Sequence, residues 1–157
     1  MSTLKVTNLQ KLDGSTFPVG KVGQMVSATN STAQTTTSSS YVATSLAVNI
    51  TPSSTNSKIY IISTSAVSNN NTSDVCRYSI MRDSTVLSGG SMAVLFSSAS
   101  NDIRIGTCVQ FLDSPSTTSQ ITYALGHRTG GVATSTVNKN GYTGSITAIE
   151  VLAWVQN

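Results

Sequence analysis

The stretch YVATSLAVNITPSSTNSKIYIISTSAVS (residues 41–68) decides the fold class of this chain. Its first ten residues alternate, and the more apolar of the two alternating sets ends in Leu46, Val48 and Ile50. A period of two is typical of a β-strand with one buried face. The segment TPSSTNS supplies the Pro, Ser and Asn of a turn, and KIYIISTSAVS follows as a second strand.

The rest of the chain repeats this pattern. Its 157 residues include 27 Ser and 23 Thr but one Glu and five Lys, so few side chains favour a helix. Further alternating segments place apolar side chains on one face: Cys76, Tyr78 and Ile80; Ile103, Ile105, Val109 and Phe111; Ile121, Tyr123 and Leu125. About eight strands separated by turns predict an all-β antiparallel sandwich, of the jelly-roll or a related type.

We expect three regions along the chain. Residues 1–27 have no clear place in an eight-stranded core and are predicted to form an extended N-terminal arm. Residues 28–40 are rich in Ser and Thr and form either a linker or an edge strand, and residues 41–157 form the β-sandwich head. The alternative for the arm is a disordered terminus. Its apolar side chains are expected to dock it on a partner: Leu4, Val6, Leu9, Phe17 and Val19.

Charge and hydropathy bear on the partners. The net charge of +3 reflects a scarcity of acids, and the Lys and Arg residues are scattered singly, so no nucleic acid is expected as a partner. The chain has no apolar run of the roughly eighteen residues that suggest a membrane span, so no membrane insertion is expected. The start MSTLKVTNLQ lacks the apolar region of a secretory signal.

No group of residues points to an enzyme, a cofactor or a metal site. The single histidine, His127, has no nucleophile or orienting acid that the sequence assigns to it, and we expect it on the surface or in a loop. Most Asp residues lie at predicted turns, where Asp bonds the backbone, so a glycosidase pair is not expected. Calcium binding by such turns is an alternative, without EF-hand spacing. Cys76 and Cys108 are expected as core thiols, with a disulfide bridge as the alternative.

The last predicted strand, SITAIEVLAWVQ (145–156), is apolar on both faces. One face can fill the sandwich, and the other needs a partner surface, because a large exposed apolar patch is unusual on a monomer. Glu150 within it is either a paired buried charge or faces a subunit axis. The candidate subunit interface consists of Ile149, Val151 and Trp154.

Several segments carry a resemblance to a known group of proteins. They are ITPSSTNSKI (50–59), RDST (82–85), SPSTTSQITYAL (114–125) and GSITAIEV (144–151), after a short N-terminal segment and a Ser/Thr-rich strand. In this the chain resembles small tail-fibre or appendage proteins of tailed, especially marine, bacteriophages. The resemblance implies a virion structural protein with jelly-roll heads in a homotrimer, located in the virion, without catalytic residues. The chain departs from long fibres in having no coiled-coil or β-helical shaft.

A directional hypothesis follows if the arm anchors the protein to other virion proteins. Counting alternating strands from residue 41 places the loops 51–57, 83–84, 113–118 and 138–144 together at the far tip. There they are expected to meet a host-surface glycan, because they combine hydrogen-bonding groups with an aromatic ring. The receptor-facing candidates are Asn56, Asp113, Asn138, Lys139, Asn140 and Tyr142.

Three other functions remain open from the sequence. The first alternative is a capsid-decorating (head-fibre) or tail-connecting structural protein without a receptor role. A hydrolytic tailspike would need a groove with paired carboxylates, for which the sequence offers little. A lectin outside any virus would not depend on the arm for binding.

Overall fold

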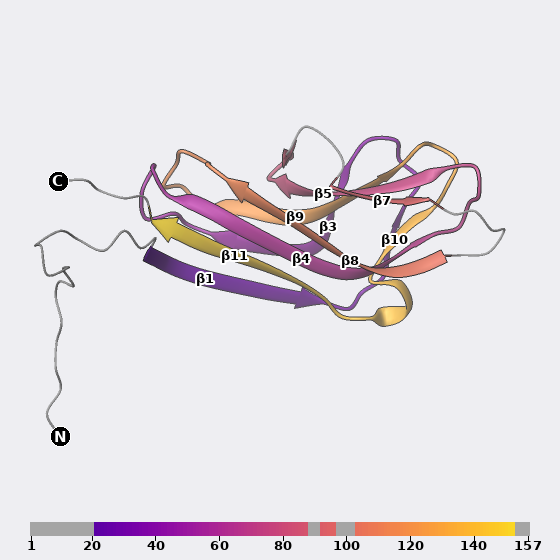
Figure 1. Cartoon of the computed structure of the whole chain (residues 1–157), viewed down its shortest axis with the longest axis horizontal. Coiled ribbons are helices and arrows are strands. Elements are labelled where there is room, and N and C mark those ends of the chain that lie inside the picture. The colour runs from indigo at the N-terminus through magenta and orange to yellow at the C-terminus, as the bar shows by residue number, and fades with distance from the viewer. Residues whose placement is uncertain (1–20, 88–91, 97–102, 153–157) are drawn as a thin grey trace, which may run out of the picture.

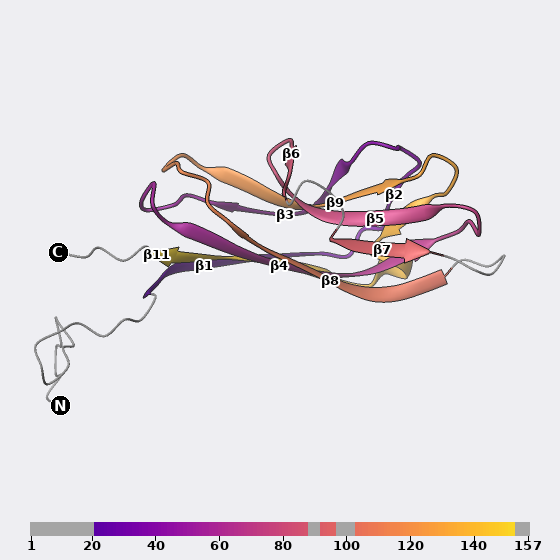
Figure 2. The ribbon, with the colours of Figure 1, turned by 45° about the horizontal axis from the view of Figure 1, so that its top comes forward.

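The computed structural model describes residues 21–87, 92–96 and 103–152, which form two antiparallel β-sheets (Figure 1). The two sheets lie one above the other as the layers of a sandwich (Figure 2). No α-helix occurs in this part of the chain. It also contains no helix that is long and apolar enough to cross a membrane. The predicted all-β sandwich is confirmed.

The first sheet has four strand positions although it contains six strands. β10 and β11 lie one after the other along one side of β4, and β8 lies along the other side. β1 and β2 pair in the same way with β11 and β10. The strands are β1 (Lys21–Asn30), β2 (Gln34–Thr36), β4 (Lys58–Asn69), β8 (Ile103–Asp113), β10 (Ser135–Val137) and β11 (Gly144–Leu152).

The second sheet runs in the order β3–β9–β5, and both β6 and β7 pair with the other side of β5. Its strands are β3 (Val42–Ile50), β5 (Val75–Arg82), β6 (Thr85–Val86), β7 (Ala93–Phe96) and β9 (Ile121–Thr129). The pairing between the two halves of the chain is nested. The first strands pair with the last, β3 with β9, β4 with β8, and β5 with β6 and β7.

The core lies between the sheets and consists of the side chains that alternation places inward. Leu46, Ile59 and Ile61 have no exposed surface, and Ile50 is 2 % exposed. The predicted inward faces of the β5 and β9 segments are confirmed, because their members are 0–3 % exposed: Cys76, Tyr78, Ile80, Ile121, Tyr123 and Leu125. Apolar area removed from water at this density is the main stabilising term of such a sandwich.

The boundaries of the predicted regions differ from the structure. β1 begins at Lys21, within the segment predicted as an arm, and pairs with β11 from Lys21↔Leu152 to Asn30↔Gly144. β2 lies at the edge of the first sheet, within residues 28–40. The sequence of residues 22–29, VGQMVSAT, does alternate. Its polar residues made it look unlike a core strand, because β1 lies at the edge of the sheet. The anchoring candidates Leu4, Val6, Leu9, Phe17 and Val19 lie outside the described residues.

The extra strand overturns the directional hypothesis. β1 begins at the end of the sandwich where β4 also begins, because Val22 pairs with Val151 and Val151 with Lys58. The loops 51–57 and 114–120 lie at this same end, since β3 and β8 end there. These loops therefore lie where the N-terminal segment enters the sandwich, and the opposite end is the far one.

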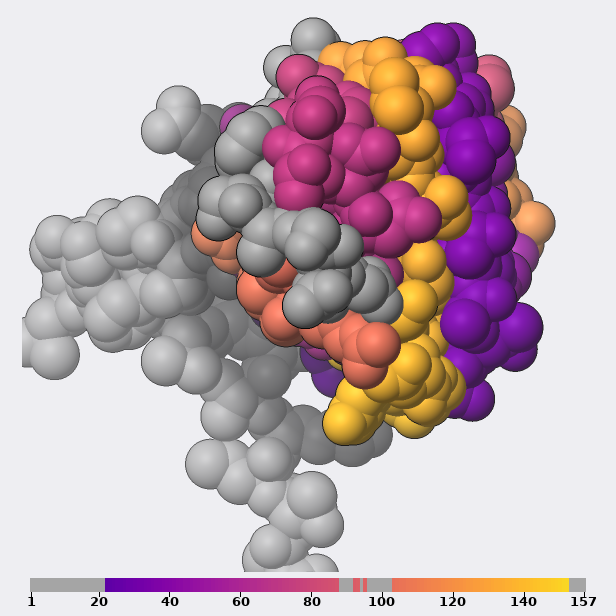
Figure 3. Space-filling view, turned by 90° about the vertical axis from the view of Figure 1, so that its right-hand side faces the viewer, coloured from indigo at the N-terminus to yellow at the C-terminus, as the bar shows by residue number. Residues whose placement is uncertain are grey.

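Hydrogen bonds join several loops at the far end, which faces the viewer in Figure 3. The Asp74 carboxylate accepts hydrogen bonds from the amides of Val75, Val132 and Ala133 at 2.7–2.8 Å. Desolvation alone would raise the pKa of Asp74, but these amides and that of Gly130 outweigh it and lower the pKa. The amide of Thr129 donates to the carbonyl of Ser38 at 2.8 Å, which joins the segment after β2 to β9.

Candidate functional site

A row of apolar side chains crosses the outward face of the first sheet. In β11, Ile146 is fully buried, while Ile149 is half-buried and points the other way. Directly paired residues of antiparallel strands share a face. The register pairs Met25 with Ile149, Ile149 with Tyr60, and Tyr60 with Leu112. These four side chains form the apolar row, which crosses β1, β11, β4 and β8.

Part of this surface is open to solvent. Met25 is 66 % exposed and Leu112 49 %. Val22, which is 60 % exposed, pairs with Val151 in the neighbouring row of the same face. Exposed apolar side chains that join into one patch are characteristic of a surface that contacts another molecule.

The predicted subunit-interface residues lie partly on this surface. Ile149 and Val151 both face outward from β11, and Trp154 lies outside the described residues. Met25, Tyr60 and Leu112 were not predicted as interface residues, although each belongs to an alternating segment. Alternation shows that a residue faces outward, but it does not show which strand lies next to it.

A shallow pocket of about 260 Å³ lies at the η2 turn (Lys139–Gly141), beside β4 and β8. It is lined by Ala66, Arg104, Ile105, Gly106, Lys139 and Tyr142. Tyr142 is 64 % exposed, and a side chain placed at Gly106 would meet nothing within 4 Å. An aromatic face beside cationic donors can hold a small polar ligand such as a sugar ring.

The six predicted tip residues are not brought together. Asn56 is exposed in the loop between β3 and β4, and Asp113 ends β8 at the same end of the sandwich. The other four lie around η2, beside the middle of β4: Asn138, Lys139, Asn140 and Tyr142. The chain does not reverse direction at η2, because β10 and β11 both run antiparallel to β4. That is why the loop count wrongly grouped this segment with the loops 51–57, 83–84 and 113–118.

Asn138 has a structural role that rules out a solvent-facing one. It is fully buried and adopts a left-handed conformation with φ of 55°. Its backbone amide donates to the Ser65 hydroxyl at 3.1 Å, and its side-chain Nδ2 donates to Asn30 Oδ1 at 3.3 Å and to the Thr32 carbonyl at 3.2 Å. These bonds satisfy polar groups where β1/β2 and β10/β11 are interrupted side by side.

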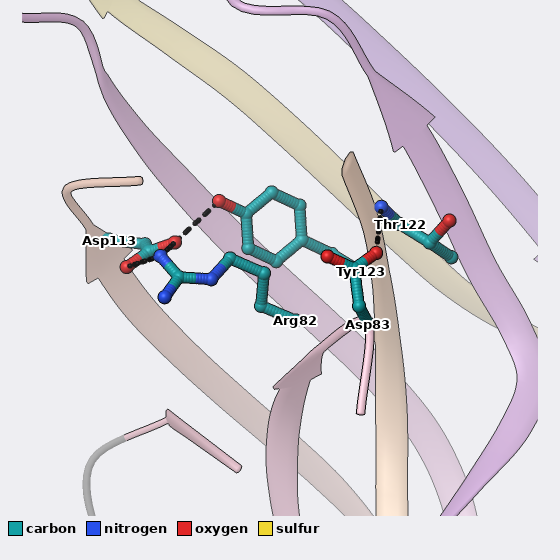
Figure 4. A network of polar contacts seen from close by, with 5 residues as sticks. All are labelled: Arg82, Asp83, Asp113, Thr122 and Tyr123. Atoms are coloured by element: carbon teal, nitrogen blue, oxygen red, sulfur yellow. Dashed lines mark hydrogen bonds and ion pairs between the residues drawn. The ribbon is translucent and has the colours of Figure 1, made fainter. Parts of the chain in front are cut away.

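Asp113 is also buried, at 6 % exposure, and is engaged within the chain (Figure 4). Arg82 Nη1 donates to both carboxylate oxygens at 3.1 and 2.9 Å, and the Tyr123 hydroxyl donates at 2.6 Å. Burial raises the pKa of Tyr123, and the neighbouring Asp113 raises it further. Asp113 therefore does not face a receptor.

His127 does not lie on the surface as predicted but is 2 % exposed within β9. Its Nδ1 lies 3.1 Å from the Ser135 hydroxyl, which donates to the Tyr78 hydroxyl at 3.2 Å. Desolvation lowers the pKa of His127 to about 4, so the ring is neutral near pH 7. A His–Ser contact without surface access offers no route for a substrate, so we assign this cluster to the core.

Glu150 is 1 % exposed and points into the sandwich, not toward a subunit axis. Its Oε1 accepts from the amide and hydroxyl of Ser53, both at 2.7 Å, and its Oε2 accepts from Gln24 Nε2 at 2.8 Å. Desolvation alone would raise the pKa of Glu150, but the polar groups of Ser57, Gln24 and Ser53 lower it to about 2. The carboxylate thus fastens β1 and the β3–β4 loop to β11.

The two cysteines occupy different surroundings. Both are free thiols; Cys76 is buried, whereas Cys108 is exposed, so the core prediction is wrong for Cys108. Cys108 belongs to the outward-facing set of the edge strand β8, which is why it lies outside the core. Within the described ranges, no three His, Cys, Asp or Glu side chains form a group that could hold a metal ion.

No known protein family matches this chain, and no curated protein matches it at a significant level.

Proposed function

We propose that the chain is a structural protein of a bacteriophage virion, a short tail fibre or appendage whose copies associate as a homotrimer. The observation that carries the proposal is the apolar row on the outward face of the first sheet, with Met25 and Leu112 most exposed. We assign a second copy as the partner of this face. Burying the row between copies would remove apolar area from water, which favours association.

The strand order supports the jelly-roll part of the proposal. The strands pair in a nested order: β1 with β11, β3 with β9, β4 with β8, and β5 with β7. This pairing gives two sheets, each four strands wide. This is the double-sheet arrangement of jelly-roll domains. The resemblance of the four sequence segments to tail-fibre proteins supports the virion role and the trimer.

In the proposed orientation, the segment preceding β1 attaches to other virion proteins. The end where β5 begins and β9 ends then points away from the particle. The pocket formed with Lys139 and Tyr142 lies toward that end and is the proposed contact with a host-surface glycan. The proposal assigns no catalysis, and the buried carboxylates of Asp74, Asp113 and Glu150 support this by their bonds to the chain itself.

The native mass of the full-length chain tests self-association. A complex of three times the 16.3 kDa chain is expected. The double variant Met25→Lys with Leu112→Lys places charges in the row and is expected to yield monomers of unchanged secondary structure. The matched control is Val132→Lys, at a side chain that is 74 % exposed at the far end and outside the row. A monomeric wild-type chain, or a double variant that stays trimeric, would contradict the proposed interface.

Removal of residues 1–20 tests the virion role. The shortened chain is expected to keep its β-sheet circular dichroism but to be lost from assembled particles. A shortened chain that is still incorporated would contradict anchoring by this segment. Host adsorption by particles carrying Lys139→Ala or Tyr142→Ala tests the pocket, and unchanged adsorption would remove the proposed glycan contact.

A further inference from the structure

Two arginines face each other on the outward surface of the second sheet. Arg77 on β5 pairs directly with Arg128 on β9. Both arginines are half-buried. The adjacent pair, Tyr78 and His127, points the other way and is buried in the core. Directly opposite residues lie with Cβ atoms about 5 Å apart, so the two positive charges share one surface.

This pairing is unfavourable unless something offsets it. Like charges directly opposite on neighbouring strands destabilise the sheet. Among the residues that the structure describes, Arg82 pairs with Asp113, whereas neither Arg77 nor Arg128 is paired with a carboxylate. The two arginines therefore form a concentration of positive charge on a surface otherwise rich in neutral side chains.

Arg128 is held in place on the side away from Arg77. Its Nη1 donates to the Ser39 carbonyl at 3.2 Å, and its Cζ lies 5.2 Å from the centre of the Tyr41 ring. Tyr41 precedes β3, and β9 lies between β3 and β5. A guanidinium has five N–H donors, so one hydrogen bond to the chain leaves others for an anion.

We propose that the Tyr41–Arg128–Arg77 row binds a carboxylate group of an acidic polysaccharide. Arginine matches a carboxylate with paired hydrogen bonds, and an aromatic ring beside it offers an apolar face to a sugar. Two cations suit a polymer with widely spaced charges. Double-stranded DNA carries a charge every ~1.7 Å of its axis and needs many more cations to bind at physiological salt.

The row lies at the end of the sandwich away from the start of β1, near the start of β5 and the end of β9. In the proposed virion orientation it would face the host. The inference itself does not depend on that orientation, and binding by the isolated full-length chain tests it separately from the virion role.

Calorimetric titration of the full-length chain tests the row with three carboxylated hexasaccharides, from hyaluronan, alginate and polygalacturonate. A neutral glucose hexasaccharide is the ligand control, and ionic strength is kept constant. At least one carboxylated probe is expected to bind. Arg77→Gln and Arg128→Gln are expected to weaken that binding about tenfold or more, as loss of a charge-assisted bond does. Lys58→Gln is the control for the change in net charge and is expected to bind normally.

Thermal melting at low salt supplies a second readout. Without ligand, Arg77→Gln is expected to melt at the same or a higher temperature, because the repulsion is relieved. The wild-type chain is expected to melt higher with the binding hexasaccharide, and the Arg77→Gln chain is not. A variant that melts much lower without ligand would show that Arg77 has a structural role and would overturn the proposal.

Other outcomes also overturn it. Absence of binding to all three carboxylated probes removes the site, and equal binding of the neutral probe removes the role of charge. Equal stabilisation by sulfate or phosphate would show an adventitious ion only, and preferential binding of a DNA duplex would show a different ligand class. If Arg104→Gln loses binding and Arg77→Gln does not, the ligand binds in the pocket beside β8 and not at the arginine row.

Discussion

The guanidinium of Arg82 donates two hydrogen bonds to the carboxylate of Asp113, and this ion pair joins the two sheets of the sandwich. Arg82 ends β5 in the second sheet, and Asp113 ends β8 in the first. The hydroxyl of Tyr123, from β9, donates to the same carboxylate. Three strands thus meet at one buried anion near the end where β1 begins.

Asp113→Ala is expected to destabilise the fold by about 2–4 kcal/mol, because it leaves the partly buried Arg82 and the Tyr123 hydroxyl without their acceptor. Urea unfolding monitored by circular dichroism measures the loss. Tyr123→Phe removes one bond and keeps the ring, so about 1 kcal/mol is expected. Equal stabilities of wild type and Asp113→Ala would show that the pair contributes nothing net.

His127 is expected to make stability depend on pH between 4 and 6.5. Desolvation lowers its pKa from 6.5 to about 4 in the folded chain, so the unfolded chain binds more protons within this window. Stability is therefore full above pH 6.5 and falls by about 3 kcal/mol as pH drops to 4. Unfolding midpoints at several pH values measure this change in stability. His127→Gln is expected to remove most of the pH dependence between pH 4 and 6.5. A wild-type chain equally stable at pH 4 and 6.5 would contradict the assignment.

Glu150 acts in a lower window. Because its pKa is about 2 in the folded chain and 4.5 without the fold, its contribution is complete above pH 4.5 and is lost as pH falls toward 2. Glu150→Gln is expected to cost about 2–3 kcal/mol at pH 7, since the amide cannot accept all the bonds from Ser53 and Gln24. The variant is also expected to lose most of the decrease in stability that the wild-type chain shows below pH 4.5. If the variant keeps the wild-type dependence of stability on pH below 4.5, that dependence arises from other carboxylates.

The two thiols are expected to react at different rates. Cys108 is exposed, whereas burial is the main cause that raises the pKa of Cys76 to about 11. Because the thiolate is the reactive form, iodoacetamide at pH 8 is expected to label one thiol of the native chain and both after unfolding. Mass spectrometry counts the labels, and Cys108→Ser is the control that should stay unlabelled. Rapid native labelling of Cys76 would show that the core opens readily.

Much of the architecture could be predicted from local pattern. The inward faces of β3, β5 and β9 follow from alternation, as Leu46, Tyr78 and Leu125 illustrate. His127 is two residues beyond Leu125, so the same alternation placed it inward. The surface prediction rested on its being a single histidine near a strand end without assigned partners, and the sequence does not show that Ser135, on another strand, contacts its ring.

The candidate surfaces could be predicted only in part. Ile149 was identified from its own strand, but the apolar row needed the register that aligns it with Met25 and Tyr60. The arginine row likewise exists only because β5 and β9 pair in the register Arg77↔Arg128. Residues 51 positions apart become neighbours through backbone pairing, and a local pattern carries no information on that choice.

The sequence by itself determined that the chain folds as antiparallel strands, because a period of two depends only on neighbouring residues and on burial of one face. The tertiary structure alone decided where β1 lies, that η2 interrupts a strand without reversing it, and that Asn138 and Asp113 are buried. The physical reason is that these features depend on partners distant in sequence, which satisfy buried polar groups and set the register.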